Sequence, residues 1–194
     1  MITASGFIVL PENDGCPSLE DIACSLGRAP RWRGSLKGWW TVLQHSIAIE
    51  RLAHARVLPV RTRLFALLHD AHEAVTGDVS KHWKPRSMQD HEDDLDNRIR
   101  KSLGLPDPTF QEKLAVGILD TDLALAEAAI AVVDGAEAFV SGRVGRSAPT
   151  DALAAVREVY EYSDAVGSTW DPACLCQQLF VTQVRLLVGE VKAC

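Results

Sequence analysis

Apolar residues recur at helical spacing along most of this chain, whereas the strict alternation that marks a strand is scarce. In one clear case, Leu64, Leu67, Leu68 and Ala71 form a single apolar stripe. Capping residues, glycine and proline bound the periodic segments, and they predict helices over about 18–26, 39–57, 60–75, 87–103, 109–133, 151–166 and 171–192. The pattern therefore predicts an all-α helical bundle.

Three segments interrupt the helical pattern. Residues 1–17 hold a short apolar run followed by prolines and glycine, which predicts a short extended N-terminal arm. Residues 31–38 form a basic, glycine-containing loop, and the glycines and proline of 134–150 predict another loop. A chain of 194 residues is long enough for one sizeable core, so we expect a single domain over 1–194.

The composition limits the cellular compartment in which we expect the protein. No apolar run approaches the ~20 residues of a membrane span, and no basic segment with an apolar stretch marks a leader. We therefore expect a cytoplasmic protein, in the host cytoplasm if it is viral, that does not enter membranes. The five cysteines include no CxxC pair, which argues against disulfides and four-thiolate zinc sites.

The net charge of −6 opposes binding to long nucleic acids, because such binding depends on Lys and Arg displacing counterions from phosphate. A small nucleotide remains a suitable substrate, since a few basic residues inside a cleft can hold its phosphate. A homo-oligomer is left open by the sequence.

His69 and Asp70 are the first candidate metal ligands. They are adjacent in a predicted helix, so their side chains diverge by about 100° and can hold one ion from a shared edge. Such a pair is also common on ordinary helix surfaces. His45 and Asp120 strengthen the hypothesis of a metal site, because each lies in a mainly apolar run where an unpaired polar group would be costly. An imidazole and carboxylate set suits zinc, cobalt or manganese.

Glu73 is a candidate for acid–base chemistry. It follows Asp70 by three residues, so in a continuous helix it projects on the same face, one turn further on. There it can act as general acid or base beside a metal-bound water. The alternative is a solvated helix residue.

The stretch LLHDAHEAVTGD, preceded by a helical QHS and followed by an aspartate on a later helix, resembles the HD-domain phosphohydrolases, whose pattern is H…HD…D. It is more narrowly similar to bacterial 5′-deoxynucleotidases and bacteriophage deoxynucleotide phosphohydrolases. The resemblance covers about residues 18–130, with the helices of 151–192 beyond it. The motifs that carry it are Arg31-Trp32, His69-Asp70-Ala71-His72-Glu73, Gly77-Asp78 and Lys84.

This resemblance implies roles for individual residues. One divalent metal ion, with zinc, cobalt, manganese and magnesium all open, would be held by His45, His69, Asp70 and Asp120. Glu73 would protonate the leaving oxygen or steer the attacking water, and Asp78 would support that role or contact the sugar. Arg31 and Lys84 would hold phosphate. Trp32 would stack on the base or wall the pocket. Without the resemblance, Trp32 is equally well explained as a core residue, and Lys84 is better explained as a solvated surface cation.

Two aspartates are candidates for the last metal ligand, Asp120 and Asp122. They point to nearly opposite helix faces, so only one of them can face the metal. Similar proteins tend to carry a Glu seven residues later, and Glu127 fits that register from Asp120. We therefore choose Asp120. His54, His72 and His91 are not expected to be ligands, and His72 could instead lie beside the ligands or be exposed.

Two segments depart from the family pattern. Ser35 stands where relatives often have a His, and Val79-Ser80-Lys81-His82 replaces a loop that is usually proline-rich. We expect both segments to border the nucleotide, with Ser35 and His82 as substrate contacts, and these changes leave the base preference open.

The expected function is hydrolysis of the 5′ phosphoester of a 2′-deoxynucleotide, releasing nucleoside plus phosphate or triphosphate, with dATP as the first substrate to try. A broad-specificity 5′-deoxynucleoside-monophosphate phosphatase and a non-catalytic nucleotide sensor are the alternatives. Glu73 and Asp78 beside all four candidate ligands favour catalysis.

Overall fold

The computed structural model describes residues 15–80, 83–166 and 172–193, and over these ranges the protein is helical, with two isolated bridges and no strand. The predicted all-α fold is confirmed. The helices are α1 (Leu19–Leu26), α2 (Val42–Ala55), α3 (Val60–Leu68), α4 (Glu73–Thr76), α5 (Arg86–Ser102), α6 (Phe110–Ile130), α7 (Ala136–Val144), α8 (Thr150–Val166) and α9 (Pro172–Ala193), with a 3-10 helix η1 (Arg31–Gly34) after α1. The extended arm expected over 1–17 lies, apart from residues 15–17, outside the described ranges.

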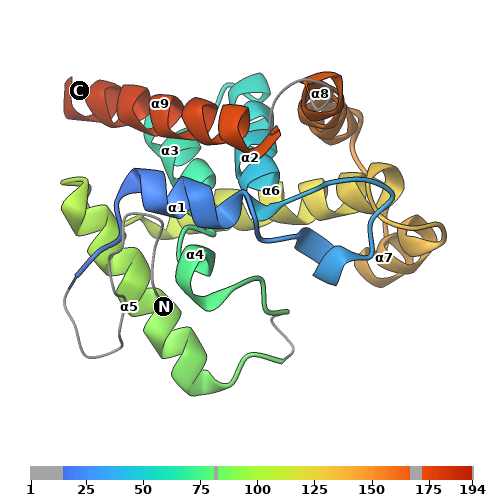
Figure 1. The fold of residues 1–194 in the computed structure, drawn as a ribbon, viewed down its shortest axis with the longest axis horizontal. Helices are drawn as coiled ribbons and strands as arrows, with labels where there is room; N and C mark the ends of the chain where they lie inside the picture. Colours follow the sequence, from blue (N-terminus) through green and yellow to red (C-terminus); the bar gives the residue numbers. More distant parts are fainter. Residues whose placement is uncertain (1–14, 81–82, 167–171, 194) are drawn as a thin grey trace.

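Helix α2 is the centre of the bundle and packs against α3, α6, α8 and α9 (Figure 1). Every residue from Val42 to Glu50 is buried. A helix buried on all sides carries its polar side chains into the core, where each of them needs a partner. His45 is one of these buried polar groups, so the position of α2 sets up the site described below.

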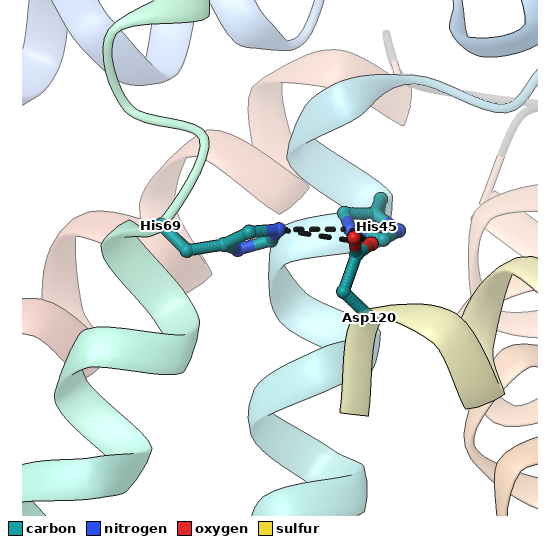
Figure 2. Close-up of side chains that lie close together, drawn as sticks. All are labelled: His45, His69 and Asp120. Atoms are coloured by element: carbon teal, nitrogen blue, oxygen red, sulfur yellow. Dashed lines mark hydrogen bonds and ion pairs between the residues drawn. The ribbon is translucent and has the colours of Figure 1, made fainter. Parts of the chain in front are cut away.

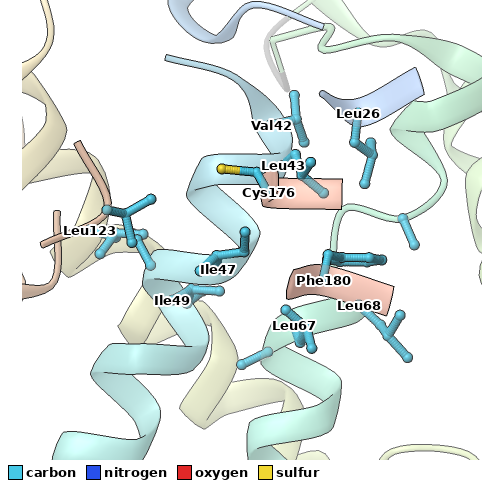
Figure 3. Close-up of a cluster of buried hydrophobic side chains, with 14 of the residues drawn as sticks. Leu26, Val42, Leu43, Ile47, Ile49, Leu67, Leu68, Leu123, Cys176 and Phe180 are labelled. Atoms are coloured by element: carbon cyan, nitrogen blue, oxygen red, sulfur yellow. The ribbon is translucent and has the colours of Figure 1, made fainter. Parts of the chain in front are cut away.

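The core around α2 is built from aliphatic side chains of several helices. Figure 3 shows Leu26 of α1, Leu43 of α2, Leu67 of α3 and Phe180 of α9 in one buried cluster. Their burial stabilises the bundle by about 1.5–3 kcal/mol for each large side chain. This packing fixes the mutual positions of α2 and α3, which supply the two histidines of the site.

Local signals explain where the first two helices begin. Ser18 caps α1, because its side chain accepts a hydrogen bond from the backbone N–H of Asp21. Helix α2 begins at Val42 rather than at 39, because Thr41 and Gln44 form a capping box that satisfies two backbone N–H groups.

The continuous helix predicted over 60–75 is wrong. Helix α3 ends at Leu68, residues 69–72 form a turn, and the short helix α4 follows. In this turn the N–H of Ala71 donates to Leu68 O and that of Glu73 to Asp70 O, so hydrogen bonds to the third preceding residue replace the α-helical ones. His69 and Asp70 consequently lie on a tightened turn rather than inside a helix.

The loop predicted over 134–150 is also wrong, because α7 occupies its centre. Gly135 and Gly145 adopt left-handed conformations, with φ of 91° and 80°, immediately before and after this helix. These glycines therefore bound a helix instead of marking a loop. Within the described ranges, no helix is both long and apolar enough to cross a membrane.

Candidate metal centre

Two histidines and an aspartate from three helices converge beside the core (Figure 2). His45 comes from α2, His69 follows the last residue of α3, and Asp120 comes from α6. His45 Nε2 lies 3.3 Å from His69 Nε2 and 3.3 Å from Asp120 Oδ1, and His69 Nε2 lies 3.9 Å from Asp120 Oδ1. These three side chains can each offer one ligand atom to a metal ion.

Asp70 completes the cluster. Its Oδ2 lies 3.2 Å from His69 Nε2 and 3.6 Å from His45 Nε2. The structure thus brings together all four residues proposed as metal ligands, with two imidazole nitrogens and two carboxylate oxygens. Such a mixed set suits zinc, cobalt or manganese.

Hydrogen bonds fix which nitrogen of each ring faces the cluster. His45 Nδ1 lies 2.6 Å from Glu127 Oε1, and His69 Nδ1 lies 2.8 Å from the carbonyl oxygen of Ala66. The carbonyl oxygen only accepts, and so does the Glu127 carboxylate, so each Nδ1 carries a proton. The Nε2 atoms of the neutral rings are then both acceptors, and they face each other and two carboxylates. This arrangement requires positive charge, either as protons on the rings or as a bound cation.

The shifts in pKa of the clustered side chains also indicate that the cluster favours positive charge. Burial alone lowers the pKa of His69, but the carboxylates of Asp70 and Asp120 outweigh it and raise that pKa to about 9. Burial raises the pKa of Asp70, yet His69, His45 and Arg31 hold it well below its usual range. Negative charge therefore dominates the cluster, whose histidine and aspartate side chains could hold a metal ion.

Glu127 of α6 belongs to the same cluster, and its only sign in the sequence is its spacing of seven residues from Asp120. It is fully buried on α6, and its Oε2 accepts hydrogen bonds from Trp32 Nε1 at 2.9 Å and Arg31 Nε at 3.2 Å. Although burial raises its pKa, Arg31 and His45 lower it to about 2, so Glu127 is an anion. A carboxylate on the second nitrogen of a ligating His orients that ring and raises its basicity.

Arg31 and Trp32 lie next to the cluster, but they contact protein carboxylates. Arg31 NH1 lies 3.3 Å from Asp70 Oδ2, in addition to its contact with Glu127. Trp32 has a positive φ of 54°, a conformation that costs a residue other than glycine about 1–3 kcal/mol. Strain of this kind is found at functional segments, and here it accompanies the hydrogen bond from the indole to Glu127.

Glu73 lies in α4 with its carboxyl group buried. Its Oε2 has no hydrogen-bond partner among the described residues, and its Oε1 lies 3.9 Å from Lys84 Nζ. Burial raises the pKa of Glu73, the carboxylates of Asp70 and Asp78 raise it further, and the result is about 9. The raised pKa favours the protonated form of Glu73, which can act as an acid.

Lys84 and His72 face α5. Lys84 Nζ lies 3.0 Å from Glu92 Oε1, and His72 Nδ1 lies 3.1 Å from Asp96 Oδ1. Asp70, His72 and Glu73 form a second group whose ligand atoms lie within 4.8 Å of one another. The Lys84 ammonium beside Glu73 supplies positive charge at this group, as the Arg31 guanidinium does at Asp70.

Three further residues predicted for the site are Asp78, Ser35 and His82. Asp78 is half-buried and close enough to Glu73 and Arg31 to shift the pKa of both groups. Ser35 is exposed and holds its loop through its backbone, with its N–H donating to Trp32 O and its carbonyl accepting from Val133. The predicted contact from His82 lies outside the described residues.

The two rival aspartates of α6 point to different partners. Asp120 faces His45, whereas Asp122 is buried against Arg56 at 2.7 Å and also pairs with Arg146. Asp122 is thus tied to ion pairs with two arginines, and Asp120 is the aspartate that lies beside His45 and His69.

Comparisons with known proteins give relatives without an assigned activity. No protein-family model matches this chain. An uncharacterized protein of Rhodobacter capsulatus is 38% identical to it over 96 residues, which are 45% of this chain and 48% of that protein. The uncharacterized protein YfdR of Escherichia coli is 34% identical over 91 residues, again 45% and 48% of the two chains. The chain thus spans about half the length of the curated relatives it matches.

Proposed function

We propose that this protein is a metal-dependent phosphohydrolase of the HD type that cleaves the 5′ phosphoester of 2′-deoxynucleotides. The products are the nucleoside and either phosphate or triphosphate. The observation that carries the proposal is the pair of histidine Nε2 atoms 3.3 Å apart, flanked by Asp70 and Asp120. Both Nδ1 atoms are engaged elsewhere, so the two lone pairs are aimed at one point, as metal ligands are.

The donor set fits one divalent cation held by His45, His69, Asp70 and Asp120. Such an ion supplies Lewis acidity toward a phosphoryl oxygen and lowers the pKa of a water molecule toward neutrality. The protein side chains around it have separate tasks, which follow from their positions and charges.

Glu73 supplies a proton to the leaving group. Its carboxyl group is buried, and burial together with the carboxylates of Asp70 and Asp78 raises its pKa, which favours the protonated form. Expulsion of the 5′ oxygen of a nucleoside leaves an alkoxide, which is a poor leaving group unless it is protonated. A positioned acid contributes about 10²–10⁴-fold to such a step. Asp78, which shifts the pKa of Glu73, supports its protonated state.

Arg31 and Lys84 bind the phosphate. Arg31 uses Nε and NH1 for Glu127 and Asp70, and a guanidinium group has five N–H donors, so further donors remain for a phosphate oxygen. Lys84 lies beside Glu73 and places a second positive charge near the proton donor. These two cations neutralise charge that phosphoryl transfer develops on the oxygens.

The proposal is tested by incubating the protein with each deoxynucleoside mono-, di- and triphosphate in the presence of zinc, cobalt, manganese or magnesium. Released nucleoside and phosphate are quantified by chromatography. We expect turnover that His69→Ala abolishes and that His54→Ala, which removes an exposed histidine of α2, leaves unchanged.

Other outcomes would replace the proposal. Tight nucleotide binding without any released nucleoside would indicate a sensor. Similar rates on all deoxynucleoside monophosphates, with none on triphosphates, would indicate the broad-specificity phosphatase. Turnover that survives both His69→Ala and Asp120→Ala would remove the metal centre from the reaction.

A further inference from the structure

A cavity of about 720 Å³ lies between α3, α5 and α6, next to the metal centre. His69 and Asp120 line it, so one part of its wall consists of proposed metal ligands. Figure 1 shows α5 on the far side of α3 and α4 from the α7–α8 end of the bundle. The volume lies in the range of pockets that hold small organic ligands.

The wall of this cavity combines apolar surface with polar groups. The apolar side chains are those of Phe65, Ile99 and Val116. Asn97 and Arg100 contribute amide and guanidinium groups, and the carboxylates are those of Asp93, Asp96, Glu112 and Asp120. A nucleoside has matching parts, because its base is a flat apolar ring with hydrogen-bonding edges. Pockets that bind such ligands are typically apolar with a few placed polar groups.

Arg100 brings a guanidinium group to the cavity wall that is only partly hydrogen-bonded within the protein. Its Nε is buried without a hydrogen-bond partner among the described residues, while its NH2 donates to Asn97 Oδ1. A buried donor without a partner costs about 1–3 kcal/mol, so it is uncommon unless something else satisfies it. A guanidinium group has five N–H donors, so Arg100, which lines the cavity, can still offer a donor to a ligand.

The phosphate-binding candidates are arranged elsewhere around the metal centre. Arg31 contacts Asp70 and Glu127, and Lys84 contacts Glu73 and Glu92. Neither cation lines the cavity, and neither does Trp32. A phosphoester held by these cations would therefore extend its organic part past His69 and Asp120.

We infer that the nucleoside part of the substrate binds in the cavity between α3, α5 and α6, with its 5′ oxygen toward His69 and Asp120. The inference rests on the proposed function for the identity of the ligand. According to this inference, the side chains that recognise the base are Asn97 and Arg100 rather than Trp32, Ser35 and His82.

Gly117 allows a direct test. It lines the cavity from α6, and a Cβ atom added to it would meet no atom within 4 Å. A side chain at Gly117 therefore starts in open space at the cavity wall, so Gly117→Phe is a crowding variant, and replacing a helical glycine does not reduce helix propensity. Gly189→Phe is the matched control, because Gly189 is an exposed glycine of α9 whose Cβ would also meet nothing. Lys113→Trp is a second crowding variant, since Lys113 also lines the cavity and is exposed.

The readout is binding of the four deoxynucleosides, which contain no phosphate, measured by calorimetry and ligand-observed NMR. We expect the wild-type protein and Gly189→Phe to bind at least one nucleoside in the millimolar range or tighter. Gly117→Phe and Lys113→Trp should weaken that binding roughly tenfold or more. Binding of inorganic phosphate to the metal-loaded protein should stay unchanged in all variants, because Arg31 and Lys84 lie outside the cavity.

Two results would overturn the inference. One is a wild-type protein that binds no deoxynucleoside, and the other is nucleoside binding that Gly117→Phe affects no more than Gly189→Phe does. Because nucleosides cannot be hydrolysed, this result is independent of turnover. If the protein hydrolyses nucleotides but the cavity variants bind nucleosides normally, the proposed function stands and the inference about the cavity fails. If the protein binds nucleosides in the cavity but hydrolyses no nucleotide, the inference stands and the proposed function fails.

Discussion

Glu127 Oε1 lies 2.6 Å from His45 Nδ1, in the fully buried interior of the bundle. This contact holds the His45 ring so that Nε2 faces His69, Asp70 and Asp120. The other oxygen of Glu127 accepts from Arg31 and Trp32. One carboxylate thus links the proposed metal centre to the loop that carries the phosphate-binding arginine.

The first prediction concerns this link. Glu127→Gln keeps the shape of the side chain but removes the charge that makes His45 a better donor. We expect the affinity for a divalent ion to fall about 10–100-fold, measured by competition with a coloured chelator. Glu137→Gln, at an exposed position of α7, is the control. Unchanged metal affinity in a folded Glu127→Gln protein would make Glu127 a purely structural group.

The second prediction separates Glu73 from the ligands. Glu73→Gln replaces a buried, protonated carboxyl group by an amide of the same shape, so the fold and the metal should be retained. Turnover should fall by about 10²-fold or more, because the amide cannot give up a proton. The measurements are kcat at saturating nucleotide and the metal content by elemental analysis. Loss of the metal together with activity would identify Glu73 as a ligand instead.

The third prediction concerns metal removal. An ion that binds only the folded protein stabilises it by about 2.7 kcal/mol at a concentration 100 times its Kd. Dialysis against a chelator should therefore lower Tm, and returning zinc or manganese should restore it. In Asp120→Asn the added metal should have a much smaller effect, whereas Asp134→Asn, which alters an exposed aspartate, should respond like the wild type. An equal response of both variants would exclude Asp120 as a ligand.

The fourth prediction is a pH dependence of stability at the junction of α2 and α8. Asp151 Oδ2 lies 2.8 Å from Arg56 Nε, and this hydrogen bond lowers the pKa of Asp151. A lowered pKa contributes stability that is present above the unfolded value of 3.8 and is lost as the pH falls through the folded value. Asp151→Asn should therefore lower the free energy of unfolding near pH 7 by less than about 1 kcal/mol, since the pair is partly exposed. The difference from wild type should shrink in urea titrations below pH 4, and a constant difference would contradict this assignment.

Much of the fold could be predicted from local signals. Ser18, the apolar stripe of α3 and the long apolar run of α6 each mark a helix by chemistry that does not depend on the rest of the chain. Helix α7 was missed because Gly135 and Gly145 suggest a loop unless their left-handed conformations are known. The break after Leu68 was missed because the apolar period continues through it to Ala71.

The candidate site was predictable as a list of residue types but not as a network. His45, His69, Asp70 and Asp120 stand out because polar groups in apolar runs need partners. The contact of Glu127 with His45 joins residues 82 positions apart, and only the packing of α2 against α6 reveals it. The spacing of two turns from Asp120 to Glu127 was the available signal, since it places both side chains on one helix face.

The last prediction concerns Trp32, which by resemblance would stack on the base or wall the pocket. In the structure its indole N–H donates to Glu127 Oε2 at 2.9 Å, and Trp32 does not line the cavity between α3, α5 and α6. Trp32→Phe should then act through Glu127 and lower kcat/KM for all four deoxynucleotides by a similar factor. About 5-fold is expected, as for loss of one hydrogen bond of about 1 kcal/mol. Asn97→Leu should instead change the ranking among bases, because it alters a polar group in the cavity wall. Both variants are assayed with the same metal and salt, with Tm as the check on folding. If Trp32→Phe changes the ranking and Asn97→Leu does not, the base lies over the η1 loop, and the cavity has another role.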